Sequence, residues 1–254
     1  MKKRALSLLM ALIMVVSLLP TAVWAADGTL SGSGTEADPY LIEDADDLKA
    51  FRDKVNAEDN STLCAKLTAN IDLNNESWTP INSKSGYVTT AYSGTFDGAG
   101  HTITNLNVTG NGFFSAVCNA TIQNLKVSGS VSGSSVNVGG IVGLTQGSVE
   151  IKNCSFSGSV TSSKSTSSSG VGGIVGKMNA GTLTVQNCAN HATVTGGCPG
   201  GIVGYGGGTS NKLIIENCYN DGTINGKYNS SGICASNTST NSTITNCYNA
   251  GAVS

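Results

Sequence analysis

Short aliphatic segments recur along most of the chain, separated by stretches of glycine, serine, threonine and asparagine. An aliphatic residue followed two positions later by asparagine returns at intervals of about 19 to 34 residues. The asparagines of this column are Asn105, Asn124, Asn153, Asn187, Asn217 and Asn246. A further aliphatic column follows seven positions after most of them, at Val131, Val160, Val194, Ile224 and Val253. The intervals leave no room for an ordinary helix, so the pattern predicts short β-strands in stacked coils.

The pentapeptide GGIVG occurs at residues 139–143, 172–176 and 200–204 and supplies another strand to each coil. Its defining positions are Gly140, Ile141, Gly143, Gly173, Ile174, Gly176, Gly201, Ile202 and Gly204. A phosphate-binding loop would need a strand before it and a helix after it, and neither is predicted. We therefore expect the isoleucines in the core and the glycines at tight corners and close approaches between coils. Three strands per repeat predict an all-β, right-handed parallel β-helix of about six or more coils.

The recurring asparagine interrupts the in–out alternation of its strand, because the next residue is Leu or Cys. A left-handed residue at a corner would reset the alternation, and asparagine adopts that conformation more readily than most residues. We expect the asparagines to form corners and their side chains to hydrogen-bond along the rod.

Four of the eight cysteines directly follow an asparagine of this column: Cys154, Cys188, Cys218 and Cys247. Leu106 and Leu125 occupy the same place in other repeats, which favours buried thiols. Stacking would also bring neighbouring cysteines within disulfide range, and some disulfides remain an alternative. Cys198, in a Gly-Gly-Cys-Pro turn, is predicted to be the most exposed thiol. Without CxxC pairs or spaced histidines, neither a metal nor a cofactor is expected.

Residues 35–97 differ from the repeats and predict an N-terminal cap. Asp44 is a plausible helix N-cap, and Leu48, Phe51 and Val55 share one face of the helix that would follow. An amphipathic helix here would cover the open strand edges at the end of a solenoid.

The chain begins with basic residues, an apolar run and a small-residue cleavage pattern typical of a secretory signal peptide. We expect residues 1–25 to be this peptide, residues 26–34 a flexible linker, and residues 98–254 the β-helix repeats. The apolar run is too short to span a bilayer, so no membrane insertion is expected after cleavage. The protein is expected to be secreted or held at the cell surface. The repeats stop midway through a coil, which predicts a truncated piece of a longer parent protein.

Charge is sparse and uneven. Thirteen of the 16 acidic residues lie between Asp27 and Asp97, and the repeats carry six scattered lysines and no arginine. Without a basic stripe, nucleic acid is excluded as an expected partner.

Asp97 and His101 are weak candidates for catalysis, because a carboxylate and an imidazole lie close together in the sequence. Polysaccharide-degrading β-helix enzymes need clustered carboxylates on one face, and the repeats offer none. A turn at Asp97 is the favoured interpretation, and a non-catalytic protein is expected. A carbohydrate-binding or carbohydrate-active β-helix is the alternative.

Three segments carry a resemblance to a known family: GSGTEADPYLIEDADDLKAF, LTANIDLNNESWTPI and YSGTFDGAGHTITNL, followed by the GGIVG and NCYN repeats. Together they resemble the GLUG-motif β-helix domain of bacterial secreted and surface proteins, over roughly residues 33–254. The resemblance implies an adhesin-like scaffold or spacer whose partner is a host or microbial surface glycan or protein. Such domains also accompany immunoglobulin-cleaving metallopeptidases, but this chain has no HExxH motif.

Overall fold

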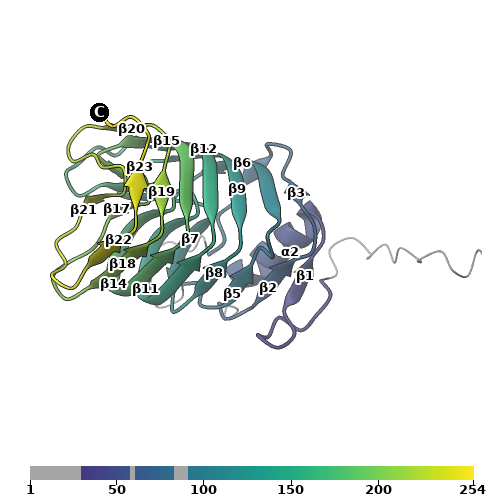
Figure 1. The fold of residues 1–254 in the computed structure, drawn as a ribbon. Helices are drawn as coiled ribbons and strands as arrows, with labels where there is room; N and C mark the ends of the chain where they lie inside the picture. Colours follow the sequence, from purple (N-terminus) through teal and green to yellow (C-terminus); the bar gives the residue numbers. More distant parts are fainter. Residues whose placement is uncertain (1–29, 58–60, 83–90) are drawn as a thin grey trace, which may run out of the picture.

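The computed structural model describes residues 30–57, 61–82 and 91–254. Within these residues, parallel strands stack into a solenoid of about six coils, with one α-helix near the N-terminal end (Figure 1). The prediction of an all-β parallel solenoid is confirmed. The signal peptide predicted at residues 1–25 lies outside the described residues.

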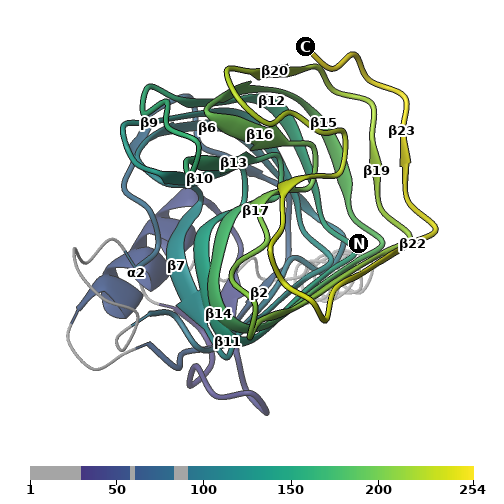
Figure 2. The same ribbon diagram turned by 90° about the vertical axis from the view of Figure 1, so that its left-hand side faces the viewer.

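Three parallel sheets form the walls of the solenoid and enclose its core, as the view along the stack shows (Figure 2). The eleven-stranded sheet contains β1 (Tyr40–Ile42), β2 (Ala65–Leu67), β5 (Thr95–Asp97), β7 (Phe114–Cys118), β8 (Thr121–Gln123), β11 (Val142–Lys152), β14 (Val175–Gln186), β17 (Val203–Tyr205), β18 (Lys212–Glu216), β21 (Cys234–Ser236) and β22 (Thr243–Thr245). The nine-stranded sheet contains β3 (Ile71–Asp72), β4 (Ser77–Trp78), β6 (Thr102–Thr109), β9 (Lys126–Gly133), β12 (Ser155–Ser162), β15 (Ala189–Gly196), β19 (Tyr219–Asn220), β20 (Ile224–Gly226) and β23 (Tyr248–Asn249). The three-stranded sheet contains β10 (Asn137–Gly139), β13 (Gly170–Gly172) and β16 (Cys198–Gly200).

The core is a set of side-chain columns that run along the stack. Strands β8, β11, β14 and β18 pair in register and place Ile122, Ile151, Val185 and Ile215 one above another, each fully buried. Strands β9, β12, β15 and β20 do the same with Val131, Val160, Val194 and Ile224, whose exposed fractions are at most 1%. Full burial of an aliphatic side chain contributes about 1.5–3 kcal/mol, so these columns are a main source of stability.

Helix α2 (Ala45–Asn56) covers the N-terminal part of the core. Its N-cap is Asp44, whose Oδ1 accepts from the backbone N–H groups of Asp46 at 2.9 Å and Asp47 at 3.0 Å. Such caps stabilise a helix by about 1 kcal/mol. Leu48, Phe51 and Val55 are buried, and the Phe51 ring lies 5.8 Å from that of Phe96 on β5. The amphipathic face predicted from the sequence is therefore the face that packs on the coils.

The GGIVG segments form one corner of three successive coils. Ile141, Ile174 and Ile202 are fully buried, and the backbone N–H of each of the first two donates to the carbonyl of the next, at 3.2 Å in both cases. The glycine before each isoleucine supplies space. A Cβ on Gly173 would lie 2.2 Å from the amide oxygen of Asn190 and 2.3 Å from the carbonyl oxygen of Gly201. Any larger residue would push the coils apart.

One predicted column is wrong at its first member. Asn105 has the left-handed backbone of the other asparagines, with φ of 56°. However, Ile103 pairs with Val127 of β9, and the register then shifts before Leu106, so Asn105 lies at a bulge within β6. The residue that stacks on Ile122 is Phe96. The aliphatic-x-asparagine pattern marks a left-handed residue in both places, but only the later repeats use it as the shared corner.

Candidate functional site

The corner asparagines build a polar ladder along the outside of the solenoid. Their backbones are left-handed, with φ of 52–54° at Asn124, Asn153, Asn187, Asn217 and Asn246. The Asn153 amide donates to the Asn124 oxygen at 2.9 Å, and the Asn187 amide donates to the Asn153 oxygen at 3.1 Å. Because each amide is both donor and acceptor, identical side chains can continue the ladder from coil to coil.

Asp97 is the last member of this ladder at its N-terminal end, where its carboxylate takes the place of an asparagine amide. Its oxygens accept from the side chains of Asn124 and Gln123, both at 3.0 Å, and from the Ala99 backbone N–H at 2.8 Å. Burial alone would raise the pKa of Asp97, but the three hydrogen bonds together lower it. A general acid at neutral pH needs a raised pKa, so the environment of Asp97 favours a structural anion.

His101 does not join Asp97 in an acid–base pair. Its backbone N–H donates to the Gly98 carbonyl at 2.8 Å, which closes the turn that Asp97 opens. Neither a hydrogen bond nor an ion pair links the imidazole ring to the Asp97 carboxylate. The two weak catalytic candidates are therefore close in sequence and separate in their interactions.

The cysteines that follow the corner asparagines form a column of free thiols. The backbone N–H of Cys154 donates to the sulfur of Cys188, that of Cys188 to Cys218, and that of Cys218 to Cys247, each at 3.4 Å. All eight cysteines lie in the described residues and are free. Burial raises the pKa of the Cys188 thiol well above its ordinary value, which keeps it protonated and unreactive.

The prediction that Cys198 is the most exposed thiol is wrong. Cys198 is fully buried, because β16 is a strand of the three-stranded sheet and not a surface turn. Its sulfur donates to the Ser167 carbonyl at 3.2 Å. The more accessible thiols are those of Cys118, Cys234 and Cys247, and burial still raises the pKa of Cys234 to about 12.

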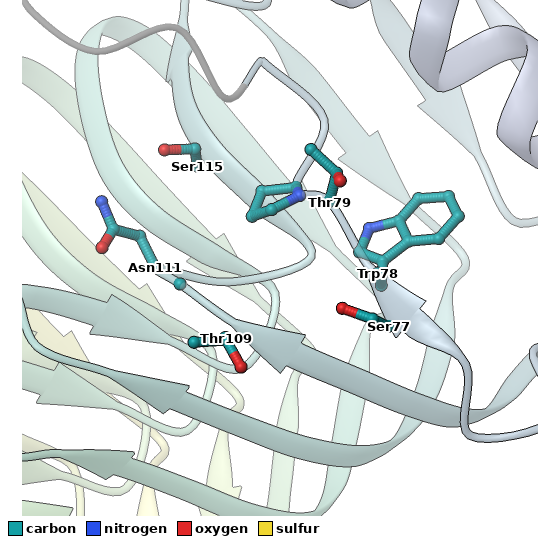
Figure 3. A pocket seen from close by; sticks show the side chains of 8 residues that line it. Ser77, Trp78, Thr79, Thr109, Asn111 and Ser115 are labelled. Atoms are coloured by element: carbon teal, nitrogen blue, oxygen red, sulfur yellow. The ribbon is translucent and has the colours of Figure 1, made fainter.

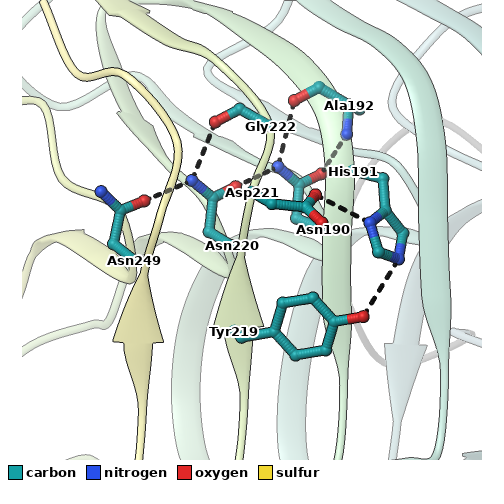
Figure 4. Close-up of polar contacts among 8 residues, drawn as sticks. All are labelled: Asn190, His191, Ala192, Tyr219, Asn220, Asp221, Gly222 and Asn249. Carbon is teal, nitrogen blue, oxygen red and sulfur yellow. Dashed lines mark hydrogen bonds and ion pairs between the residues drawn. The ribbon is translucent and has the colours of Figure 1, made fainter.

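A second amide ladder lies inside the wall and is not predicted from the sequence (Figure 4). Asn190 and Asn220 are fully buried, and the Asn190 amide donates to the Asn220 oxygen at 2.6 Å. The Asn220 amide in turn donates to the oxygen of Asn249 at 2.6 Å and to the Gly222 carbonyl at 2.9 Å. The signal that could have revealed it is the second asparagine of the pattern NCxN, which occurs in the last three repeats.

Beside this ladder, His191, Asp221 and Tyr219 form a row on the surface (Figure 4). The Nδ1 of His191 lies 2.7 Å from an Asp221 oxygen, and its Nε2 lies 3.5 Å from the Tyr219 hydroxyl. Burial, and then the Asp221 charge, raise the pKa of Tyr219, so the phenol stays protonated at neutral pH. The row therefore offers no activated nucleophile, and a half-exposed polar contact of this kind contributes at most about 1 kcal/mol.

A hollow of about 340 Å³ opens on the side of the solenoid near the N-terminal cap (Figure 3). Strand β4 pairs with the end of β6, and the segments that follow both strands leave the sheet side by side around the hollow. In the part of the chain that the structure describes, its lining is made of Ser, Thr, Asn, Pro, Gly and Trp residues, and none of these side chains is charged. In the sequence these residues are scattered over loops, and no motif marks them.

The first GGIVG segment lies within a stretch that matches a known family. Residues 134–161, which run from the turn before β10 into β12, match the GLUG motif. The chain carries a GLUG motif. The motif spans β10, β11 and most of β12, with the corners between them, so its glycines and isoleucine are the packing residues described above.

Two known proteins share broader similarity with this GLUG-containing chain. Halomucin from Haloquadratum walsbyi (strain DSM 16790 / HBSQ001) is 34% identical in a match 169 residues long that covers 60% of this chain and 2% of Halomucin. The chain thus corresponds to a small fraction of that protein. A crystal structure of a candidate immunoglobulin A1 protease from Bacteroides ovatus superposes with a TM-score of 0.54 at 21% identity, over 86% of this chain and 77% of that one. At this identity the likeness concerns the fold alone.

Two further kinds of site are missing from the described residues. They contain no helix that is long and apolar enough to cross a bilayer. They also contain no group of three or more histidine, cysteine or acidic side chains placed to hold a metal ion.

Proposed function

We propose that this chain is a non-catalytic, extracellular or cell-surface β-solenoid module that acts as an adhesin-like scaffold or spacer. One observation carries the proposal: the special residues of the repeat are used in stacking. Asparagines form corner and wall ladders, cysteines form a column that is buried at Cys154, Cys188 and Cys218, and glycines allow coils to approach. The GLUG motif and the similarity to Halomucin support a surface-protein module.

The position of the charged groups also supports a scaffold. Asp97, the better placed of the two catalytic candidates, is held ionised by three hydrogen bonds. The histidine nearest to it in sequence makes neither a hydrogen bond nor an ion pair with it. A glycoside hydrolase requires two carboxyl groups facing one another across a bound sugar, and Asp97 has no such partner among the described residues. The partners proposed are a surface glycan or protein and the remaining domains of a longer parent protein.

A mechanical experiment tests the spacer role. The chain is held between two handles and stretched in a single-molecule force experiment. A spacer should stay folded under load and then unfold coil by coil, because parallel ladders must be broken one after another. Extension as a featureless flexible chain at low force would contradict the proposal.

A chemical experiment tests the absence of catalysis. The chain is incubated with plant and host polysaccharides, and the release of reducing ends is measured. We expect none above the level of the Asp97→Asn variant. Turnover by the natural chain that this substitution abolishes would instead establish a carbohydrate-active enzyme. Export is tested separately, by finding the mature N-terminus at Ala26 in a secreting host.

A further inference from the structure

The hollow beside β4 has the composition of a binding site for a neutral, hydroxyl-rich ligand. Five polar side chains surround it: those of Ser77, Thr79, Thr109, Asn111 and Ser115. None of these side chains makes a hydrogen bond within the described chain, although hydroxyl and amide groups nearby in the coils are paired repeatedly. Five side chains with uncommitted donors and acceptors therefore line one opening, and Ser77, Thr79 and Thr109 among them are exposed to solvent (Figure 3).

The walls of the hollow are held rigidly, which lowers the cost of binding. Trp78 is 3% exposed, its ring stacks on Phe113 at 5.4 Å, and its indole N–H donates to the Phe113 carbonyl at 3.4 Å. The Ser115 backbone N–H donates to the Ile81 carbonyl at 2.9 Å. The backbones that carry the polar side chains are thus fixed before any ligand arrives. The indole supports the floor and is not available as a stacking face.

The chemistry of the lining selects the class of ligand. A hydroxyl or amide group both donates and accepts, as the hydroxyls of a sugar do. Among the lining residues that the structure describes, none is cationic and could pair with an anion, and an apolar ligand would leave five polar groups unpaired. Pro80 is buried as well, so its ring, like the indole of Trp78, forms part of the wall and is not a stacking face. A volume of about 340 Å³ is at the small end of ligand sites and matches one sugar residue better than a long oligosaccharide.

We propose that this hollow binds one neutral hexose or N-acetylhexosamine residue of a glycan. This goes beyond the scaffold role, which does not depend on it. A single small site with few contacts gives weak binding, with a Kd on the order of 1 mM. Many copies displayed on a surface would raise the effective affinity through multivalency.

The test uses the full chain and defined sugars. Methyl glycosides of mannose, galactose, glucose and N-acetylglucosamine are titrated to about 100 mM while amide shifts are followed by NMR. At least one glycoside should shift residues 77–80 and 109–115 and leave the far end of the rod unchanged. Glucuronic acid should bind no better than glucose, because the described lining residues carry no positive charge.

Matched variants decide whether the hollow itself is the site. Thr109→Val and Ser115→Ala remove two hydroxyls without changing a buried group, and together they should weaken binding about tenfold. Thr193→Val makes the same change as Thr109→Val at an exposed position on β15 and should leave binding unchanged. The proposal is overturned if no neutral glycoside shifts the amide signals of the lining residues, or if Thr193→Val weakens binding as much as Thr109→Val with Ser115→Ala. It is also overturned if glucuronic acid binds more tightly than glucose. None of these outcomes would alter the force–extension behaviour that tests the scaffold.

Discussion

Removing one buried side-chain amide from the wall ladder, which is formed by Asn190, Asn220 and Asn249, should destabilise the solenoid more than the small size of the amide group suggests. Asn220 is fully buried and takes part in three hydrogen bonds, with Asn190, Gly222 and Asn249. Asn220→Ala deletes the amide and introduces no bulk at a place where the coils are in close contact. The backbone of Gly201 packs directly against the Asn220 side chain, because a Cβ added to Gly201 would lie only 2.6 Å from Asn220 Cγ.

The loss of unfolding free energy follows from the hydrogen bonds that each partner of Asn220 keeps or loses. The Asn190 amide keeps its bond to the Ala192 carbonyl at 3.1 Å, and the exposed Asn249 can bind water. The Gly222 carbonyl is buried and loses its side-chain donor. Two net buried hydrogen bonds at about 1–1.5 kcal/mol each, with a small void, give about 2–4 kcal/mol. For a domain of this size that corresponds to a fall in Tm of about 5–15 °C.

Urea unfolding followed by far-ultraviolet circular dichroism measures this loss, with thermal unfolding as a second readout. Asn179→Ala is the matched control, because its amide donates to Gln146 on the exposed surface and its loss should cost less than about 0.5 kcal/mol. A double variant with Asn190→Ala should cost less than the sum of the single variants, since both ends of one bond then disappear. If Asn220→Ala is no more destabilising than the control, the ladder does not contribute as argued.

Three further perturbations test other parts of the architecture. Gly173→Ala should destabilise by more than about 3 kcal/mol in urea unfolding, because its Cβ would overlap Gly201 and Asn190, whereas Gly208→Ala, with open space around it, should be close to neutral. Asp97→Asn should destabilise by about 1–2 kcal/mol at pH 7. The pKa of Asp97 is lower in the folded chain than in the unfolded one, so the stability that its carboxylate contributes is present above the unfolded pKa of about 3.9 and is lost as the pH falls through the folded value. The difference in unfolding free energy between the natural chain and the variant should therefore narrow below about pH 4. A difference that does not depend on pH would contradict this. Under native conditions a thiol reagent should modify Cys118 and Cys247 well before the buried Cys188, and peptide mass analysis can follow the rate at each cysteine. Equal rates would show that the cysteine column is open to solvent.

The coil architecture can be predicted from the sequence because it depends on repetition. Every coil must place an aliphatic residue where the next coil does, so Ile151, Val185 and Ile215 already form a column when the repeats are aligned with one another. The same logic fails at Asn105, because a bulge in β6 produces the same three-residue pattern as a corner. A local pattern specifies a backbone conformation, and only the register of the neighbouring strand decides which coil position it occupies.

Features that depend on a single place in the fold cannot be predicted in this way. Cys198 stands beside glycines and a proline, which is typical of a turn, yet pairing with Gly170 makes it part of a buried sheet. The hollow is formed by residues from two segments that lie about 30 positions apart and become neighbours only when β4 pairs with β6. No periodicity marks such residues, because the contact occurs once.

The wall ladder also bears on how a protein of this kind can change its length during evolution. A side-chain amide pairs best with another amide at the equivalent position of the next coil, as Asn190 does with Asn220. A coil with this ladder therefore stacks well on a coil that repeats its own sequence. Insertion of one whole coil would give every column a matching partner above and below. Loss of a single residue within a coil would misalign the aliphatic, thiol and amide columns together. Gene duplication in units of one repeat is therefore the change such a rod tolerates, and its reach can be adjusted in steps of about 4.8 Å without redesign of any other part.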